Sequence, residues 1–410
     1  MKTKFLLLTS LVSEKNHSSY MALMILIDKL TKSLENGDNV LGIFLDFSKA
    51  FDTVNHRILL LKLEYYGIRG AALSWLDSYL KNRKQFVTYN NVKSSMKHVN
   101  CGVPQGSILG PLLFLIYIND LESVCVNTFP ILFADDTNIF MSGKDTRELE
   151  IKMNDELIAI SKWLKVNKLS LNVKKTHYMI FSPKRILNQE INLQIEGYPI
   201  NRVKSTKFLG VFIDEKLNWK SHISHVCGKI SRGIGIILKG KNMLNRDALV
   251  TLYYSFIYPY YIYGNYVWGR ANATTLKPLI LIQKKCVRII CNVKPRYHTN
   301  ELFKQLGFLK CSDINNYLIG RFMYRWFNGN VPDMFVNFFD YIINVHNYNT
   351  RQSSHLCVAF ARTNIGQSCI SFIGPKIWNT ITDKININTS DFIFSKALKQ
   401  FILNDGLSNL

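Results

Sequence analysis

The sequence lacks the cysteine spacing of a structural zinc site and contains no internal repeat or long low-complexity tract. Its eight cysteines are scattered, and no two form a Cys-x-x-Cys pair, so the usual zinc-binding pattern is missing. A disulfide framework is not expected in so large a chain without a secretory context. We therefore expect reduced thiols and a location in the nucleus and cytoplasm.

Acidic residues are also scarce relative to basic ones. The chain has 51 Lys and Arg against 29 Asp and Glu, a formal net charge of +22. Such a field favours a polyanionic partner, with nucleic acid first and an anionic membrane surface second. A solvated basic surface is the plainer alternative. Leu249 to Trp268 is long enough to span a bilayer, but it contains Pro259 and seven tyrosines, so buried helices fit it better.

The pattern of apolar residues divides the 410 residues into three parts. Strand-like and helix-like runs alternate up to about Asp214, which predicts an α+β sheet with helices packed on one face. The clearest strands are expected at 41–45, 129–133 and 137–141. The next part is helical, basic and aromatic, and the last is rich in Asn, Ser and Thr. We therefore predict domains at 1–214, 215–340 and 341–410.

Three carboxylates are placed where strands end or turn. Asp46 follows an apolar strand, and Asp135 and Asp136 lie at the tip of an apolar hairpin. If the strands are neighbours, the three groups cluster at one sheet edge and need divalent cations to offset their repulsion. Oxygen ligands suit Mg²⁺, and two ions about 4 Å apart can activate a 3′-hydroxyl and stabilise a leaving pyrophosphate. Taken alone, each piece is better explained as an Asp in a turn.

A loop rich in glycine and proline lies between these acidic sites. Residues 102–111 contain three glycines and two prolines and lead directly into an apolar helix that Pro111 is expected to open. Glycine lets the backbone approach a ligand closely, and Gln105 can hydrogen-bond a base or a sugar. A plain connection would not need so dense a loop.

These motifs, in their order, carry a resemblance to a known family. The segments Phe44-Leu45-Asp46, Ala50-Phe51-Asp52, Pro104-Gln105-Gly106 and Phe133-Ala134-Asp135-Asp136 resemble the successive palm motifs of reverse transcriptases. The segment 169–176 is similar to the next motif, and Lys207-Phe208-Leu209-Gly210-Val211 to the primer-grip strand of the non-LTR class. Further similarity at 263–269, 283–285 and 348–351 extends the resemblance from about Ser18 onward, to jockey-type retrotransposon polymerases.

The resemblance implies a right-hand polymerase with an antiparallel palm sheet backed by helices, followed by a helical thumb. The implied activity is RNA-directed DNA synthesis, with two Mg²⁺ ions, for which Mn²⁺ can substitute. The implied partners are an RNA template, a DNA primer and deoxynucleoside triphosphates, with no membrane. The oligomeric state stays open.

The resemblance also assigns functions to individual residues. Asp46 and Asp135 would hold both metals, Asp136 would assist, and the carbonyl of Phe47 would add an oxygen ligand. Phe51 would crowd a ribose 2′-hydroxyl and so favour deoxynucleotides, with an ordinary core Phe as the alternative. Gln105 and Gly106 would contact the incoming nucleotide and the template. Lys175 would lie near the triphosphate, with Lys174 as its rival. For either lysine, a solvated cation is the plainer interpretation.

One departure from the family pattern bears on activity. Only 45 residues precede Asp46, and they resemble just the last part of the fingers, without an endonuclease region. We therefore expect a chain truncated at its N-terminal end, with weak or absent polymerase activity because part of the triphosphate clamp is missing. A remnant that binds RNA without catalysis is the alternative to an active enzyme.

Overall fold

The computed structural model describes residues 18–133, 136–183, 191–345, 353–404 and 407. The chain forms two compact units, which we describe separately. The sheet unit comprises Gly37–Lys204, and the helical unit comprises Lys15–Asn36 together with Ser205–Leu410. The three-part division at residues 214 and 340 stays a prediction.

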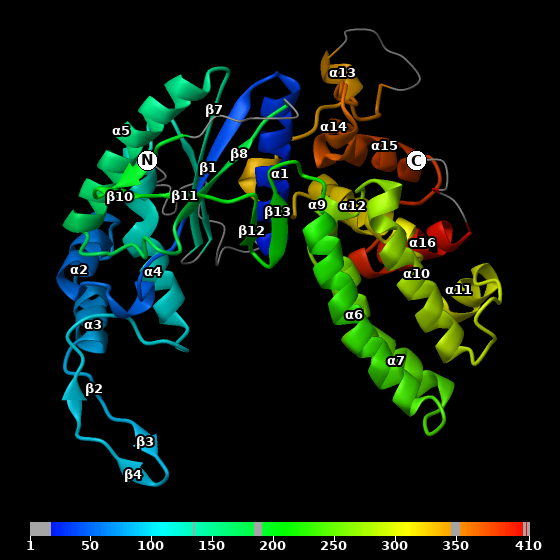
Figure 1. Ribbon diagram of the computed structural model, residues 1–410, viewed down its shortest axis with the longest axis horizontal. Helices are drawn as coiled ribbons and strands as arrows, with labels where there is room; N and C mark the ends of the chain where they lie inside the picture. The colour runs from blue at the N-terminus through cyan, green and yellow to red at the C-terminus, as the bar shows by residue number, and fades with distance from the viewer. Residues whose placement is uncertain (1–17, 134–135, 184–190, 346–352, 405–406, 408–410) are drawn as a thin grey trace. The chain divides into compact units, whose positions relative to one another are not determined.

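A five-stranded sheet in the order β11-β8-β1-β7-β6 forms the centre of the sheet unit (Figure 1). The pairs β8–β1, β1–β7 and β7–β6 are antiparallel, and the edge strand β11 is parallel to β8. Two helical connections, one before β6 and one before β8, complete a β-α-β-β-α-β arrangement of the ferredoxin-like type. The strands are β1 (Asn39–Leu45), β6 (Phe129–Phe133), β7 (Asp136–Gly143), β8 (His177–Phe181) and β11 (Asn201–Arg202). The predicted α+β fold with an antiparallel sheet is confirmed.

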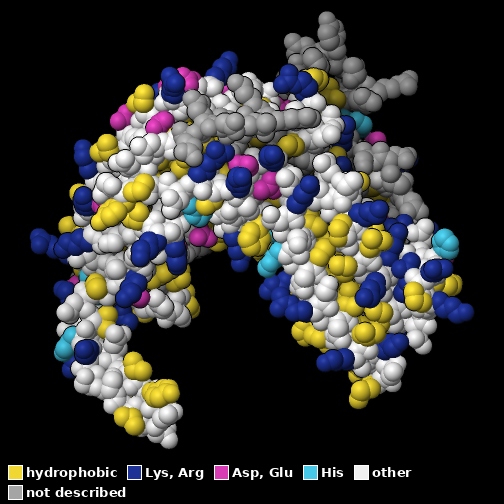
Figure 2. Space-filling model, in the orientation of Figure 1, with side chains coloured by type: hydrophobic (Ala, Val, Ile, Leu, Met, Phe, Trp, Pro, Cys, Tyr) yellow, Lys and Arg dark blue, Asp and Glu magenta, His cyan; other side chains and the backbone are white. Residues whose placement is uncertain are grey.

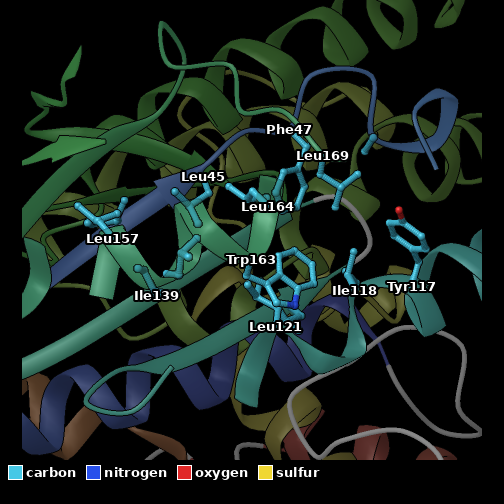
Figure 3. Packing of buried hydrophobic residues seen from close by; sticks show 14 of the residues in the cluster. Leu45, Phe47, Tyr117, Ile118, Leu121, Ile139, Leu157, Trp163, Leu164 and Leu169 are labelled. Atoms are coloured by element: carbon cyan, nitrogen blue, oxygen red, sulfur yellow. The ribbon is translucent and has the colours of Figure 1, made fainter. Parts of the chain in front are cut away.

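Helices cover one face of this sheet because their apolar stripes match its alternating side chains. Leu41, Ile43 and Leu45 of β1 point to the same face and belong to one buried cluster with α4 and α5 residues. In α5, buried residues recur every three or four positions, the spacing of a single helix face. Figure 3 shows Leu45 and Ile139 of the sheet packed near Leu157 and Leu164 of α5. The helices are α2 (His56–Tyr65), α3 (Ala71–Leu80), α4 (Leu109–Ile118) and α5 (Thr146–Val166), with the 3-10 turns η1 (Ala50–Asp52) and η2 (Asn119–Val124).

Helix α4 begins earlier than the sequence predicted. Pro111 was expected at its first position, but the helix begins at Leu109. The Gly110 N–H donates to Ser107 Oγ at 2.9 Å, which satisfies one of the free donors of the first turn ahead of Pro111. The expected strands at 41–45, 129–133 and 137–141 all lie within observed strands.

A narrow two-stranded ribbon, which we call the arm (residues 83–98), follows α3. It consists of β2 (Lys84–Gln85) paired with β5 (Lys97–His98), then β3 (Thr88–Tyr89) paired with β4 (Val92–Lys93). Asn90 and Asn91 form its turn with φ of +46° and +63°, the left-handed conformation that tight hairpins require and that Asn tolerates. Figure 1 shows the ribbon extending beyond α3. The smaller strands β9 (Gln194–Ile195) and β10 (Tyr198–Pro199) form a separate hairpin.

In the part of the helical unit that the structure describes, one short hairpin accompanies a set of helices. Its hairpin pairs β12 (Ser205–Phe208) with β13 (Val211–Asp214). The longer helices are α1 (Ser19–Glu35), α6 (Lys220–Gly240), α7 (Arg246–Phe256), α10 (Ala273–Ile290), α12 (Cys311–Phe327), α15 (Ile370–Thr382) and α16 (Asp391–Leu403). The shorter ones are α8 (Tyr258–Ile262), α9 (Asn265–Trp268), α11 (Asn300–Leu306), η3 (Asp333–Phe335), α13 (Ile342–Val345) and α14 (Asn364–Ser368).

The uncharged stretch from Leu249 to Trp268 is divided among three helices of this unit. Two of its tyrosines pack in the core: Tyr253 and Tyr261 are almost fully buried, and the Tyr261 hydroxyl donates to Leu279 O at 3.0 Å. Gln283 of α10 belongs to the segment 283–285, which the resemblance includes. Its buried side-chain amide donates to the Tyr253 hydroxyl at 3.0 Å. Among the described helices, none combines the length and the apolar character needed to cross a bilayer.

Candidate active site

Strand β1 ends beside the start of β7, and this pairing relates two of the predicted carboxylates. Leu45 pairs with Thr137 in the antiparallel ladder, and Asp46 and Asp136 are the next residues in that register. Opposite residues on antiparallel strands have Cβ atoms about 4.5–5.5 Å apart. If the register continues by one pair, both carboxylates therefore point to the same face at this end of the sheet.

The third carboxylate, Asp135, lies outside the described residues, and its place in the cluster stays a prediction. The Asp46 side chain is half-buried, with 42% of its surface exposed, and Asp136 is exposed at the start of β7. In the described ranges, no group of three His, Cys, Asp or Glu side chains could hold a metal ion. Carboxylate oxygens are nevertheless the ligands that Mg²⁺ prefers, so the donors at this strand end fit the predicted ion.

The backbone around Phe47 is held by a bridge to the segment that follows α5. Phe47 pairs with Leu171, the Ser48 N–H donates to Ser170 O at 2.8 Å, and the Asn172 N–H donates to Asp46 O at 2.7 Å. These bonds use the groups on either side of Phe47. None of the described residues donates a hydrogen bond to the Phe47 carbonyl oxygen. That oxygen is thus left with the capacity that a metal ligand needs.

The same segment encloses Asp46 and brings a lysine to it. The Asp46 N–H donates to Thr176 Oγ1 at 3.4 Å, and Thr176 Oγ1 donates to Asn172 O at 3.1 Å. Lys175 Nζ lies 3.8 Å from Asp46 Oδ2. Both side chains are more than one-third exposed, so the pair contributes little to stability. It places the Lys175 ammonium beside Asp46, and the assignment of Lys175 rather than its rival Lys174 to the triphosphate stays a prediction.

The glycine-rich loop packs directly against the turn that carries Phe51. The Gly102 N–H donates to Val54 O and the Val103 N–H to Phe51 O, both at 2.8 Å. A Cβ on Gly102 would lie 2.7 Å from Asp52 O, and its φ is +85°. Only glycine allows this approach without strain. The close contact explains why so dense a loop precedes α4.

Gln105 and Phe51 are held by contacts that the sequence did not predict. Gln105 Nε2 donates to Asp52 Oδ1 at 2.9 Å, and Gln105 and the neighbouring Gly106 are exposed. The Phe51 ring packs on Phe114 of α4, with ring centroids 4.7 Å apart. Phe51 is therefore a partly buried residue that α4 supports, and the sugar-gate interpretation stays a prediction.

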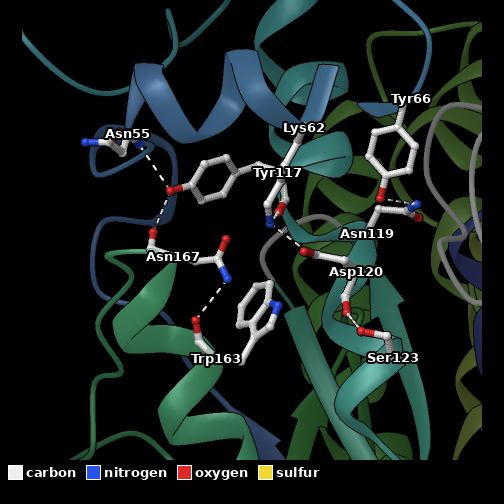
Figure 4. Close-up of polar contacts among 9 residues, drawn as sticks. All are labelled: Asn55, Lys62, Tyr66, Tyr117, Asn119, Asp120, Ser123, Trp163 and Asn167. Carbon is white, nitrogen blue, oxygen red and sulfur yellow. Dashed lines mark hydrogen bonds and ion pairs between the residues drawn. The ribbon is translucent and has the colours of Figure 1, made fainter. Parts of the chain in front are cut away.

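The buried hydroxyl of Tyr117 connects the turn after Phe51 to the segment that carries Lys175. Tyr117 of α4 is fully buried, accepts a hydrogen bond from the Asn55 N–H at 3.3 Å and donates one to Asn167 O at 2.5 Å. Burial raises the pKa of Tyr117 to about 12, which keeps the hydroxyl protonated. Asn55 follows the Phe51 turn, and Asn167 precedes the segment that carries Lys175. Figure 4 shows Tyr117 between them.

Lys62 supports the same region from α2. Its Nζ donates to Tyr117 O at 2.6 Å and pairs with Asp120 Oδ1 at 2.7 Å (Figure 4), and it lies 5.1 Å from the Trp163 ring centroid. Burial lowers the pKa of Lys62, and the pair with Asp120 opposes that shift. A cation here satisfies a buried helix end and faces two aromatic rings.

Sequence reasoning missed Tyr117, Asp52 and Thr176 as supporting residues. Asp52 and Thr176 lie inside quoted motifs, so their spacing to Phe51 and Lys175 was the available signal. Tyr117 carried none, because an aromatic residue in an apolar helix is an ordinary core residue. Only the packing of α4 against both loops reveals its hydrogen bonds.

The predicted primer-grip strand forms a tight hairpin in the helical unit. Leu209 and Gly210 turn between β12 and β13 with φ of +44° and +80°. The Tyr263 hydroxyl donates to Leu209 O at 2.7 Å and lies 3.2 Å from where a Gly210 Cβ would be. Two segments that the resemblance identified separately are thus in contact within one unit.

Comparison with curated proteins finds relatives among insect mobile elements. The chain is 27% identical over 309 residues to an RNA-directed DNA polymerase from mobile element jockey of Drosophila melanogaster, covering 72% of this chain and 33% of that protein. It is 26% identical over 277 residues to a probable RNA-directed DNA polymerase from transposon X-element of the same species, covering 64% and 30%. The chain thus spans about a third of the length of these relatives.

Comparison with solved structures finds apo telomerase from Candida tropicalis, at 14% identity and a TM-score of 0.39, covering 71% of this chain and 49% of that one. The family model for reverse transcriptase (RNA-dependent DNA polymerase) matches residues 7–213, a span that contains each of the palm motifs singled out above. The chain therefore belongs to the reverse transcriptase family.

Proposed function

We propose that this chain is the polymerase part of a non-LTR retrotransposon reverse transcriptase that adds deoxynucleotides to a primer 3′-hydroxyl on an RNA template. The observation that carries the proposal is the β1–β7 register, in which Asp46 and Asp136 follow the Leu45–Thr137 pair. Family membership gives the reaction class. The proposed partners are an RNA template, a DNA primer and deoxynucleoside triphosphates, and the proposed location is the nucleus and cytoplasm.

The carboxylates and one carbonyl would hold the divalent cations. Asp46, Asp135 and Asp136, with the Phe47 carbonyl oxygen, would bind two Mg²⁺ ions, for which Mn²⁺ can substitute. When bound, such ions activate the attacking hydroxyl and offset the charge of the triphosphate. The 3′-oxygen forms a bond to the α-phosphorus while the bond to pyrophosphate breaks.

The other site residues would position the nucleotide and move a proton. Lys175 would lie beside the triphosphate, where its ammonium can donate a proton to the leaving pyrophosphate. The Phe51 ring, supported by Phe114, would exclude a ribose 2′-hydroxyl. Gln105 and Gly106, exposed on a loop held by close backbone contacts, would contact the nucleotide and the template.

A primer-extension assay with the purified chain tests this proposal. The wild-type chain should extend a DNA primer on an RNA template only weakly when Mg²⁺ is present, and Asp46→Asn and Asp135→Ala should each reduce that extension about 100-fold or more, the scale of losing one group that stabilises transition-state charge. Asp155→Asn, an exposed carboxylate on α5, is the matched control and should have no effect. Extension that persists after Asp135→Ala would refute the metal assignment. RNA binding without any extension by the wild-type chain would favour the remnant.

A further inference from the structure

The arm (residues 83–98) exposes more apolar surface than a free ribbon should. Val87, Tyr89 and Val92 are 69%, 76% and 72% exposed, and Phe86 and Met96 are 46% and 60% exposed. A two-stranded ribbon is only marginally stable in water, and a cluster of exposed apolar side chains marks a surface for a partner. Figure 2 shows apolar side chains gathered at the free end of this ribbon.

The register of the arm sorts these side chains into two faces. Tyr89 pairs with Val92, and Thr88 pairs with Lys93, so each pair shares a face. One face therefore carries Tyr89 with Val92, and Val87 two residues before Tyr89. The other carries Lys93, whose Nζ lies 5.3 Å from the Phe86 ring centroid. Each face thus offers one flat aromatic ring.

The charge of the arm has a single sign. Between residues 83 and 98 there are four cations and no Asp or Glu: Arg83, Lys84, Lys93 and Lys97. No carboxylate of the described residues lies within ion-pair distance of these four. Aromatic rings interleaved with cations that have no carboxylate partner are typical of surfaces that bind single-stranded nucleic acid, because bases stack on the rings and phosphates contact the cations.

A cleft at the base of the arm continues this surface. It has a volume of about 620 Å³ and lies between α2, α3 and the residues flanking the arm. Leu60 and Leu61 give it an apolar wall, and Asn55, Asn82 and Asn100 supply amides. Arg57 and Lys81 supply two cations against the single carboxylate of Glu64. Apolar walls with a few amides and an excess of cations suit a nucleobase and its phosphate.

One hydrogen bond links the cleft to the candidate active site. His56, which lines the cleft, has Nε2 at 2.8 Å from Gly102 O. Gly102 begins the loop that carries Gln105 and Gly106. A strand lying in the cleft is therefore adjacent to the residues proposed to contact the nucleotide.

We propose that the arm and the cleft form a binding site for single-stranded RNA. Bases stack on Phe86 and Tyr89, the lysines of the arm contact phosphates, and the strand continues into the cleft beside Arg57. The identity of the strand as RNA rests on the proposed function. An acidic protein surface would match the positive charge of the arm. It would not explain why flat rings alternate with cations beside a nucleotide-sized cleft.

Fluorescence anisotropy with a labelled single-stranded RNA of 16 nucleotides and the full chain tests the site. Phe86→Ala with Tyr89→Ala should weaken binding at least about 10-fold, because each stacked base is lost with its ring. Tyr198→Ala removes a ring that is 61% exposed on β10, and it should leave the affinity unchanged. Equal RNA affinity for the wild-type chain and the arm variant would overturn the proposal and indicate a protein partner for the arm.

Salt dependence separates phosphate contacts from stacking. Lys84→Gln with Lys93→Gln should reduce the slope of log affinity against log salt by about 1.4, or about 0.7 for each lost phosphate contact with a single strand. Lys144→Gln, an exposed cation outside the arm, should not change the slope. An unchanged slope in the double variant would contradict the assignment of these lysines.

The cleft and the polymerase proposal have separate readouts. Arg57→Gln should weaken RNA binding several-fold while thermal unfolding stays unchanged, because Arg57 is exposed, and an unaltered affinity would remove the cleft from the site. Asp46→Asn should abolish primer extension but leave the RNA affinity intact. Loss of binding in the arm variants therefore stands even if no extension is ever measured.

Discussion

Within the sheet unit, the region around Tyr117 and the arm differ in how far their side chains are buried. Around Tyr117, polar groups are buried and matched: the hydroxyl serves both Asn55 and Asn167. In the arm, nearly every side chain is exposed, and the ladder of a two-stranded ribbon holds it in place. Contacts within the chain account for the residues around Tyr117. The exposed rings and cations of the arm are accounted for by the RNA that we propose it binds. Packing therefore positions the loops of the candidate active site, whereas exposed side chains form the proposed binding surface of the arm.

The largest effect expected from this difference is on core packing. Phe114 is fully buried and supports the Phe51 ring. Phe114→Ala should reduce the free energy of unfolding by about 3–5 kcal/mol, through lost burial and the cavity it leaves. Urea denaturation of the wild-type chain and the variant measures this. A loss below about 1 kcal/mol would mean that α4 does not pack tightly behind the loop.

A buried histidine of the helical unit should make the stability of the chain depend on pH. His222 is 2% exposed, and burial lowers its pKa to about 4. The unfolded chain therefore binds more protons between pH 6.5 and pH 4, so stability is present above pH 6.5 and is lost as the pH falls toward 4. We expect a loss of about 2 kcal/mol between pH 7.5 and pH 5, read from urea midpoints.

The matching controls for this pH dependence are two substitutions. His222→Gln should remove most of the loss, while His98→Gln, in the exposed arm, should keep it. Neighbouring groups that face His222 are His225, which Lys207, Lys229 and Arg232 surround, and the Trp268 ring. An identical pH profile for His222→Gln and the wild-type chain would assign the loss to other groups.

Removing a single hydroxyl tests the buried connection directly. Tyr117→Phe keeps the ring but leaves the Asn55 N–H and Asn167 O without their partner, at a cost of about 1–3 kcal/mol. Hydrogen exchange should also become faster at Asn55 and in 167–176. Tyr89→Phe removes a hydroxyl in the arm and serves as the control. Unchanged exchange in both segments would show that Tyr117 does not couple them.

The smallest effect on stability is expected in the arm itself. Tyr89→Ala should change the free energy of unfolding by no more than about 0.5 kcal/mol, the usual range for an exposed position. Chemical denaturation beside the RNA-binding assay measures this. A destabilisation comparable to that of Phe114→Ala would show that the arm packs on another part of the chain, which would remove the contrast between the two regions.

Local rules account for much of the fold. The apolar runs predicted β1, β6 and β7, because strand alternation is a property of neighbouring residues. Helix α4 begins before Pro111, where the Ser107 hydroxyl accepts a hydrogen bond from the Gly110 N–H. Within the candidate site, the motifs identified Asp46, Gln105 and Lys175, but not the Asp52 contact that holds Gln105.

The sequence by itself determined the family, the order of the motifs, the excess of positive charge and the residue types that suit phosphoryl transfer. Only the tertiary structure decided that β1 lies between β7 and β8, that the Thr176 segment encloses Asp46, and that Tyr117 joins two loops. The physical reason is distance along the chain: these contacts join residues separated by 50 or more positions. No local preference specifies such pairs, and they form because the shared core brings their elements together.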